Sequence, residues 1–352
     1  MARRLVILTE GFSNPRTAKT AANVIRYRPE EVLAVLDSTQ VGRHSGELLQ
    51  AGRVPFVARL ADVPDADTLL IGIAPPGGKI PAPWRAVILE AIDRGMDVVS
   101  GLHEFLGDDA EFAEAARRRG VRLQDVRRNH ERDVATCLDI DPSTLRVLTV
   151  GHDCSVGKMV AAVELTRACT ARGLDAKFLA TGQTGIMIDG DGVPVDCVVS
   201  DFVNGAVERL VKRHQHHDIL LIEGQGSLAH PAYSAVTLGL LHGCAPQAMI
   251  FCYEAGRTRT TSVEHRPIPP IRDIKRCFET MAEIRHPSRT IGFAINGRLL
   301  DDAAARDERR RIEDEFGLPA CDLFRDGPET LLAAIVAARA DLDRLHPRPK
   351  RV

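Results

Sequence analysis

The amino-acid sequence predicts an α/β protein with two domains, each built around a parallel, doubly wound β-sheet. Short apolar runs rich in Val, Ile and Leu alternate along the chain with longer segments of helical periodicity. A length of 352 residues accommodates two domains of ordinary size. A polar, charged stretch over residues 130–145 contains Pro142, which interrupts regular structure. We therefore expect one domain over residues 1–140 and a second over residues 141–352.

The first half of the chain has the strand and helix order of a Rossmann-like domain. Strands are predicted at residues 5–8, 31–37, 68–74 and 97–101, and helices from Lys19, over 83–94 and over 109–119. The first strand is followed by Glu10-Gly11-Phe12 and not by Gly-x-Gly-x-x-Gly, so dinucleotide binding is not favoured. Asp37 ends the second strand, and without those glycines a turn role is favoured over ribose binding. His103 and Glu104 follow the fourth strand, where such sheets bind ligands, although hydrogen bonding within the loop explains them equally well.

The second half begins with a strand, a glycine-bounded loop and an apolar helix, which is the arrangement of a P-loop. Backbone N–H groups of such a loop and the positive end of the following helix suit a phosphate, and Lys158 adds a mobile charge. Met159 stands where a Ser or Thr hydroxyl holds magnesium, and a thioether is not a hard oxygen donor. We therefore expect a P-loop NTPase-like domain that binds phosphate without a metal. The predicted cofactor-binding residues of the loop are Gly151, His152, Asp153, Cys154, Ser155, Val156, Gly157, Lys158 and Met159.

The rest of the second half continues the alternation of strands and helices. Strands are predicted at residues 175–180, 218–222, 248–253, 291–296 and 320–324, and helices at 202–213, 302–316 and 328–345. Ser200 or Asp201 is the expected N-cap of the first of these helices. The glycine-rich turn over residues 181–185 is expected beside the P-loop if the two preceding strands are neighbours. It supplies a second set of predicted cofactor-binding residues: Gly182, Gln183, Thr184 and Gly185.

An apolar strand delivers Glu223 to its carboxyl end, followed by Gly-Gln-Gly. Glu223 is interpreted as a metal ligand, a general base or a structural acid bound to backbone amides, and we favour a role in the active site. His230 lies a short loop away, and it either exchanges protons near neutral pH or holds the loop in place. Arg257 follows the next strand, and it either binds a carboxylate through two hydrogen bonds or pairs with a neighbouring acid.

Composition is that of a soluble globular protein, and a small-molecule substrate is the expected partner. The formal net charge is −2, and the arginine runs at residues 117–119 and 309–311 lie beside acidic residues, so nucleic-acid and membrane partners are not expected. The eight cysteines occur without Cys-x-x-Cys pairs, and no signal peptide is recognised, so we expect reduced thiols in the cytoplasm. The histidines of residues 214–217 are interpreted as an exposed helix end. We also expect a homo-oligomer, as is common for soluble enzymes.

Two resemblances carry the functional prediction. The loop Gly151-His-Asp-Cys-Ser-Val-Gly-Lys158 is similar to the G-T-D-T-x-V-G-K-T loop of dethiobiotin synthetase, from which Met159 departs. The loop taken with residues 180–185, 201–205, 223–228 and 230–233 resembles a bacterial and archaeal family named after a D-glutamate N-acetyltransferase. This second resemblance covers nearly the whole chain.

The second resemblance implies acetyl transfer from acetyl-CoA to the amine of an acidic amino acid, D-glutamate, with acetyl-CoA as co-substrate. We predict direct attack of the amine on the thioester, with backbone N–H groups of residues 182–185 or 224–226 stabilising the oxyanion. The predicted catalytic residues are Glu223, His230 and Asp201, and the predicted substrate-binding residues are Arg257, Lys19 and Tyr233.

Three alternatives remain open on the sequence. The first is an ATP- and magnesium-dependent ligase or kinase, with Asp201 and Glu223 as metal ligands and Asp153 as a further oxygen donor. The second is a non-catalytic nucleotide-binding regulator. The third, an NAD-dependent oxidoreductase, rests only on the Rossmann-like order of elements, and fold analogy alone is a weak argument.

Overall fold

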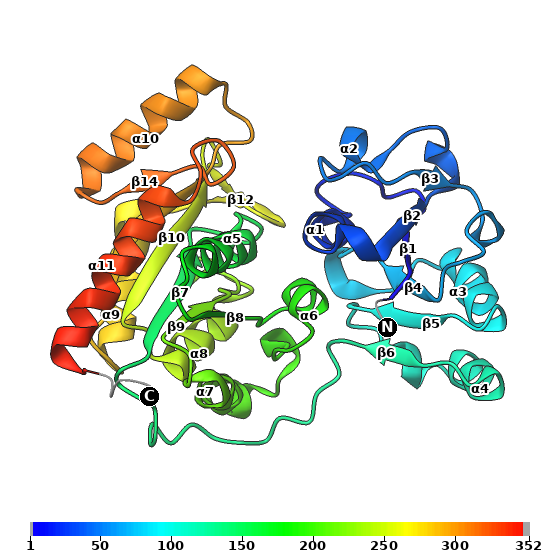
Figure 1. The fold of residues 1–352 in the computed structure, drawn as a ribbon, viewed down its shortest axis with the longest axis horizontal. Helices are drawn as coiled ribbons and strands as arrows, with labels where there is room; N and C mark the ends of the chain where they lie inside the picture. The colour runs from blue at the N-terminus through cyan, green and yellow to red at the C-terminus, as the bar shows by residue number, and fades with distance from the viewer. Residues whose placement is uncertain (1–2, 348–352) are drawn as a thin grey trace. The chain divides into compact units, whose positions relative to one another are not determined.

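The computed structural model describes residues 3–347 and divides the chain into two compact units (Figure 1). The first unit contains the chain up to Arg128 together with Ile186–Gly190, and the second contains Asn129–Gly185 and the chain from Asp191 onward. Each unit has a six-stranded sheet in which every pair of neighbouring strands is parallel. The predicted fold class, two parallel α/β domains, is therefore confirmed.

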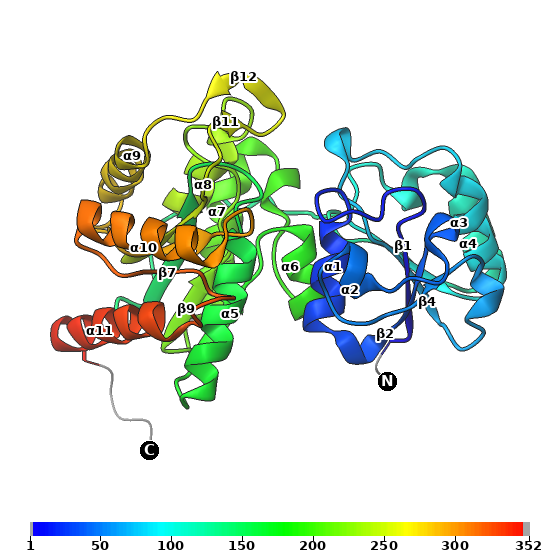
Figure 2. The same cartoon turned by 90° about the horizontal axis from the view of Figure 1, so that it is seen from above.

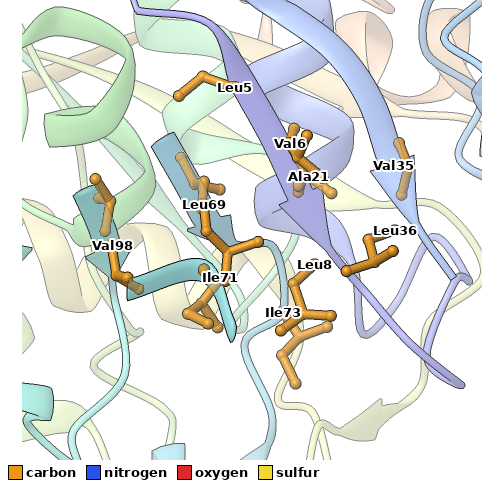
Figure 3. Close-up of a cluster of buried hydrophobic side chains, with 14 of the residues drawn as sticks. Leu5, Val6, Leu8, Ala21, Val35, Leu36, Leu69, Ile71, Ile73 and Val98 are labelled. Carbon is orange, nitrogen blue, oxygen red and sulfur yellow. The ribbon is translucent and has the colours of Figure 1, made fainter. Parts of the chain in front are cut away.

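The first unit has the sheet order β3-β2-β1-β4-β5-β6. Its strands are β1 (Leu5–Leu8), β2 (Val32–Leu36), β3 (Phe56–Val57), β4 (Thr68–Ile71), β5 (Asp97–Ser100) and β6 (Leu123–Asp125). Its longer helices are α1 (Lys19–Tyr27), α3 (Trp84–Asp93) and α4 (Ala110–Arg119), with the short α2 at Ser45–Leu48. Aliphatic side chains of the central strands are almost completely buried, as expected when both faces of a parallel sheet are covered (Figure 3).

Asp37 has the turn role that the sequence favours. Its side chain accepts a hydrogen bond from Thr39 N at 3.1 Å and from Thr39 Oγ1 at 2.7 Å, at the start of a short 3₁₀ turn. Glu10, after β1, accepts a hydrogen bond from Ser38 N at 2.7 Å. The acids at the carboxyl ends of β1 and β2 therefore hold the loops that follow these strands.

The second unit has the sheet order β14-β13-β10-β7-β9-β8. Its strands are β7 (Leu145–Gly151), β8 (Ala176–Leu179), β9 (Ile219–Ile222), β10 (Ala248–Glu254), β13 (Arg289–Asn296) and β14 (Ala320–Cys321). Its helices, with the end of α6 assigned to the first unit, are α5 (Lys158–Ala171), α6 (Gln183–Asp189), α7 (Val203–His214), α8 (Ser234–Cys244), α9 (Ile271–Glu283), α10 (Asp302–Phe316) and α11 (Glu329–Leu345). A separate antiparallel hairpin contains β11 (Arg259–Thr260) and β12 (Val263–Pro267). The loops after β7, β9 and β10 thus leave from adjacent strands.

Three local expectations in this unit differ from the structure. The first residue of α7 is Val203 and its N-cap is Phe202, which makes no side-chain cap, so neither Ser200 nor Asp201 caps this helix. Strand β8 is not a neighbour of β7, because β9 lies between them, so the condition for placing the glycine-rich turn beside the P-loop is not met. Helix α6 begins at Gln183, within the turn that was expected over residues 181–185. The turn after β8 therefore adjoins β9 and its terminal Glu223.

The segment after Arg128 packs on the second unit. Glu208 of α7 accepts hydrogen bonds from Thr136 N at 3.1 Å and Cys137 N at 2.8 Å. Gly205 leaves room for this segment, because a Cβ there would lie 1.9 Å from the Asp133 carbonyl oxygen. These contacts place the boundary between the units at Arg128 and not near residue 140. Within residues 3–347, the helices are all too short or too polar to cross a bilayer.

Candidate functional site

The P-loop joins β7 to α5 and depends on two glycines. A Cβ on Gly151 would lie 2.5 Å from the Cys252 carbonyl oxygen, so a larger residue would push the loop away from β10. Gly157 adopts φ +108° as the N-cap of α5, a left-handed conformation that favours glycine. The first N–H groups of α5 follow directly, and a helix N-terminus favours negative charge.

Lys158 lies inside this loop. The residue is 6% exposed, and its ammonium donates a hydrogen bond to the Asp153 carbonyl oxygen at 2.7 Å. Burial lowers the pKa of Lys158, because desolvation disfavours the charged form. The loop therefore combines a helix N-terminus with a buried cation, which suits an anionic ligand.

The carboxylate of Asp153 is fully buried and accepts hydrogen bonds on both oxygens. Oδ2 accepts from Thr261 N and Thr261 Oγ1, each at 2.8 Å, and from Arg257 Nη1 at 3.1 Å. Oδ1 accepts from Cys154 N at 2.7 Å. Burial alone would raise the pKa of Asp153, but these hydrogen bonds outweigh it and hold the pKa below its ordinary value. Asp153 is therefore an ionised structural anchor of the loop.

Arg257 is engaged with protein groups on both terminal nitrogens, which corrects its predicted role in substrate binding. Besides Asp153, Nη1 donates to Cys154 O at 2.7 Å and Thr261 Oγ1 at 2.9 Å. Nη2 pairs with Glu254, which is itself 2% exposed. A guanidinium whose terminal N–H groups already have protein acceptors has no pair of N–H groups left to bind a substrate carboxylate in bidentate fashion. Arg257 instead fixes the conformation of the P-loop.

His230 is also held on both sides, which corrects its predicted role as a base. Its Nδ1 accepts a hydrogen bond from Ala232 N at 3.1 Å, so the ring proton of the neutral form is on Nε2, which lies 3.0 Å from Thr261 O. Neither nitrogen has a lone pair available for a substrate proton, and the residue is 1% exposed. The same assignment argues against a metal site at Asp153, Cys154 and His230, whose ligand atoms lie within 4.8 Å of one another.

Glu223 is the one predicted catalytic residue whose environment favours proton transfer. Its side chain is buried at the end of β9, and its Oε2 accepts from Thr181 N at 3.0 Å and Gly182 N at 3.2 Å. Gln225 Nε2 donates to Oε1 at 3.1 Å. Burial raises the pKa of Glu223 to about 7, because these uncharged donors offset only part of the desolvation. The carboxyl group therefore exchanges a proton near neutral pH.

The glycines after β8 provide space for this carboxylate. A Cβ on Gly185 would lie 2.3 Å from Glu223 Oε2, and a Cβ on Gly182 would lie 3.2 Å from Oε1. Two of the N–H groups considered for the oxyanion already have acceptors, since Gly182 N donates to Glu223 and Gly224 N donates to Thr149 Oγ1 at 2.9 Å. The glycine-rich turn thus shapes the environment of the Glu223 carboxylate.

The remaining predicted residues lie in different settings. Asp201 is exposed on the 3₁₀ turn Ser200–Phe202. Tyr233 is 46% exposed, with its ring centroid 4.5 Å from that of His230. Lys19 is the first residue of α1 in the first unit, and Gln183 and Thr184 form the start of α6. The catalytic role of Asp201 and the roles of the others in substrate and cofactor binding stay predictions.

Sequence reasoning missed two residues that support the loop, and it assigned a third, His152, only to cofactor binding. Thr261 binds Asp153 from the β11–β12 turn, and no motif in the sequence points to it. Glu254 ends β10, pairs with Arg257 and accepts from Arg298 Nε at 2.6 Å. The sequence did contain a signal for Glu254, because this acid lies at the end of a predicted strand, three residues before Arg257. His152 Nε2 accepts from Glu254 N at 3.2 Å, and burial lowers the pKa of His152 to about 3, so its ring is neutral.

The loop of His103 and Glu104 lies in the first unit and borders a cavity of about 600 Å³. Glu104 Oε2 accepts a hydrogen bond from Ile80 N at 2.7 Å, which agrees with a structural role in the loop. Arg85 also lines the cavity, and its guanidinium pairs with Asp109 at 2.6 Å. The cationic group on this wall is therefore already neutralised.

Two family models match the chain. A P-loop domain of unknown function, DUF1611_C, matches residues 133–332, and a Rossmann-like domain of unknown function, DUF1611_N, matches residues 38–129. A crystal structure of a DUF1611 family protein from Anabaena variabilis superposes with a TM-score of 0.90 at 37% sequence identity, covering 95% of this chain and 99% of that one.

Two curated proteins, each called D-glutamate N-acetyltransferase, are similar to this chain. The protein from Tritonibacter scottomollicae is 35% identical over 322 residues, which cover 91% of this chain and 94% of that protein. The protein from a Pseudoalteromonas species is 36% identical over 269 residues, which cover 76% of this chain and 81% of that protein. The similarity therefore extends well beyond the P-loop motif.

Replacing Glu223 by Gln is expected to change how stability depends on pH. The Glu223 carboxyl retains its proton up to about pH 7 in the folded state, whereas the ordinary value is 4.5. The folded state therefore binds more protons in this window, and the free energy of unfolding of the wild type decreases as the pH rises from about 4.5 to about 7. Glu223→Gln removes this decrease and is expected to be more stable than the wild type above pH 7 by about 1–3 kcal/mol.

Urea unfolding at pH 5, 6, 7 and 8 measures this effect. The exposed Glu283 at the end of α9 provides the control, because Glu283→Gln should retain the wild-type pH dependence. A Glu223→Gln variant with the same pH dependence as the wild type would show that the carboxyl group is ionised throughout the range.

Replacing Arg257 by Ala is expected to destabilise the second unit. The change leaves the buried carboxylates of Asp153 and Glu254 without their shared cation, and breaking a buried ion pair costs about 3–5 kcal/mol. Arg276→Ala on α9 is the control, because that side chain is 78% exposed and its pair with Asp273 contributes about 1 kcal/mol or less. Equal urea midpoints for the two variants would contradict the anchoring role of Arg257.

Proposed function

This chain belongs to the DUF1611 family and is an N-acetyltransferase, and we propose that it transfers the acetyl group of acetyl-CoA to the amine of D-glutamate. The names of the two curated relatives support both the reaction type and the acceptor. Acetyl-CoA as the donor is supported by the chemistry of the P-loop, since CoA carries a pyrophosphate and a 3′-phosphate that an anion-binding loop can hold.

The observation that carries the proposal is the buried position of Glu223 at the end of β9, where its pKa is raised to about 7. An ammonium group has no lone pair, so the acceptor amine must lose a proton before or during its attack on the thioester. A carboxylate whose conjugate acid has a pKa of about 7 accepts that proton near neutral pH far better than an ordinary glutamate, whose pKa is 4.5. We assign Glu223 as the general base. His230, with both ring nitrogens engaged, supports the loop through Thr261.

The reaction is balanced without a metal. The ammonium group first releases one proton to solvent; the amine nitrogen then forms a bond to the acetyl carbonyl carbon, the bond from that carbon to the CoA sulfur breaks, and the second proton passes from nitrogen to Glu223. The departing CoA thiolate then takes a proton, which returns Glu223 to its ionised form. In this proposal the P-loop and Lys158 hold a phosphate of CoA, and the flexible pantetheine arm folds back along the carboxyl edge of the sheet to bring the thioester to Glu223.

The geometry offers less support for a magnesium-dependent ligase or kinase. Asp153 would have to give oxygen lone pairs to the ion, yet its carboxylate already accepts hydrogen bonds from Thr261, Cys154 and Arg257. Met159 provides no hard oxygen donor at the position after Lys158. A phosphate cradle supported internally by Arg257 suits a ligand that is bound through its phosphates and not hydrolysed there.

Glu223→Gln is expected to lower kcat for acetylation of D-glutamate by about 10²–10⁴-fold, because an amide cannot take the amine proton. In the wild type, kcat is expected to rise with pH up to about 7, as the carboxyl group ionises.

Purified protein is incubated with acetyl-CoA and D-glutamate, and both free thiol and N-acetylglutamate are quantified by colorimetry and mass spectrometry. Glu283→Gln should match the wild type. Undiminished turnover in Glu223→Gln would remove Glu223 as the base, and ATP turnover with magnesium in place of acetylation would reject the proposed function.

Gly185→Ala tests the same carboxylate without altering it. The added methyl group would lie 2.3 Å from Glu223 Oε2 and must displace the carboxylate. Gly185 lies within α6, where alanine is the better helix former, so the backbone itself tolerates the change. We expect kcat to fall at least about tenfold, within the range for a misplaced general base, while the circular dichroism spectrum stays that of the wild type. Wild-type kcat in this variant would mean that the position of the carboxylate does not limit the reaction.

A further inference from the structure

Gln225 lies two residues beyond Glu223, in the segment that connects β9 to α8, and both elements are labelled in the second unit in Figure 2. Its backbone carbonyl oxygen accepts a hydrogen bond from Thr237 Oγ1 at 2.9 Å, which ties the segment to α8. Its side chain lies against the glycine-rich turn, where a Cβ on Gly182 would be 2.5 Å from Gln225 Nε2. Backbone and side chain of Gln225 are therefore both held in place next to Glu223.

Two hydrogen-bond acceptors determine which way the Gln225 amide points. Its Nε2 donates to Glu223 Oε1 at 3.1 Å and to Thr181 Oγ1 at 3.2 Å. An ionised carboxylate can only accept hydrogen bonds, and the Thr181 hydroxyl already donates its single proton to the Glu223 carbonyl oxygen at 2.6 Å. Both neighbours therefore require N–H donors, so the amide nitrogen faces them whenever Glu223 is ionised.

The amide oxygen of Gln225 consequently points away from Glu223 and Thr181. This oxygen accepts no hydrogen bond within residues 3–347, and unlike the buried polar atoms that lack a partner, it is accessible to solvent. Gln225 is partly exposed, whereas Glu223 is buried with 4% of its surface exposed. Gln225 thus presents a hydrogen-bond acceptor on the accessible side of the Glu223 carboxylate.

Resting on the proposed reaction, we infer that Gln225 is a substrate-binding residue whose amide oxygen accepts a hydrogen bond from the ammonium group of the acceptor amino acid. An ammonium carries only donors, so it requires acceptor oxygens, and a hydrogen bond from a charged donor is stronger than one between neutral groups. The exposed Asp196 carboxylate adds negative charge here, since it acts to raise the pKa of Glu223. Acceptor oxygens and negative charge together favour a cationic amine over an anion.

The two ends of the Gln225 amide have separable effects. The N–H donor stabilises the ionised form of Glu223 and so acts to lower the pKa of that carboxyl group. The oxygen binds the amine from which Glu223 takes a proton, and it holds that amine near the carboxylate. Removing the donor should therefore change the pH dependence of turnover, whereas removing the oxygen should weaken binding of the amine.

Dissociation constants for D-glutamate and glutarate, measured by calorimetry at pH 8 with CoA present, test the binding role. Glutarate has the same two carboxylates and no amine, so the ratio of the two constants reports the contribution of the ammonium group. Gln225→Met keeps the length of the side chain without its polar atoms, and loss of a charge-assisted hydrogen bond should lower the ratio about 10–100-fold. Gln225→Glu keeps an outward oxygen and should keep the ratio, while its kcat should rise at higher pH than in the wild type.

Gln247→Met is the matched control. Gln247 is a partly buried glutamine directly before β10, and its amide is hydrogen-bonded at both ends, to Arg146 N at 2.8 Å and Thr144 O at 3.1 Å. It lies at the amino edge of the sheet, opposite the edge where Glu223 follows β9. Its replacement should lower thermal stability and leave the ratio at the wild-type value, and thermal unfolding shows that each variant is folded.

The ratio separates this assignment from the proposed function. A wild type that does not favour D-glutamate over glutarate would overturn the binding role of Gln225. A wild-type ratio in Gln225→Met would overturn it too, even if the pH dependence of kcat changes, because Gln225 would then only position Glu223. An equal loss of the ratio in Gln247→Met would also overturn it, since the effect would come from the fold. A ratio that depends on Gln225 in a protein that acetylates no amine would uphold the binding role and reject the proposed reaction.

Discussion

The fully buried carboxylate of Asp153 is the constraint on which the functional end of the second unit depends. An isolated buried charge is very unfavourable, so the carboxylate requires a cation and several hydrogen-bond donors. Arg257 and Thr261 provide them from the segment after β10, and Arg257 in turn is balanced by Glu254, whose other oxygen accepts from Arg298. The shape of the P-loop, the position of the hairpin and the orientation of His230 all follow from satisfying this one charge.

Two buried carboxylates at the same sheet edge have pKa values shifted in opposite directions, because their hydrogen-bond donors differ in charge. Asp153 has a cation and two N–H groups among its partners, and its pKa is held below the ordinary value. Glu223 has two backbone N–H groups and an amide, all uncharged, and burial raises its pKa to about 7. Environments that separate the pKa values of acids in this way assign them different roles. Asp153 is fixed as structure, and Glu223 is able to take and return a proton.

The internal cation is compatible with our proposal that this P-loop binds phosphate without a magnesium ion. The residue after Lys158 is Met159, and the nearby acid is already paired with Arg257. A loop stabilised in this way keeps its inward N–H groups and its lysine for an anion, with no requirement for a metal to hold it in shape. This architecture is compatible with a phosphate-bearing co-substrate that leaves the site with its phosphates intact, as an acyl-CoA does.

The sequence by itself determined the two parallel sheets, the P-loop and the position of Glu223 at a strand end, because these depend on local apolar runs and glycines. Only the tertiary structure decided which polar groups are free to react. Thr261 and Asp153 are separated by 108 residues, and Arg257 and Asp153 by 104, so no local pattern shows that their hydrogen bonds are mutually satisfied. Hydrogen bonds within the protein also engage Arg257 and both ring nitrogens of His230. They therefore argue against substrate binding by Arg257 and proton transfer by His230. Burial, which depends on every element packed around a side chain, gave Glu223 its near-neutral pKa.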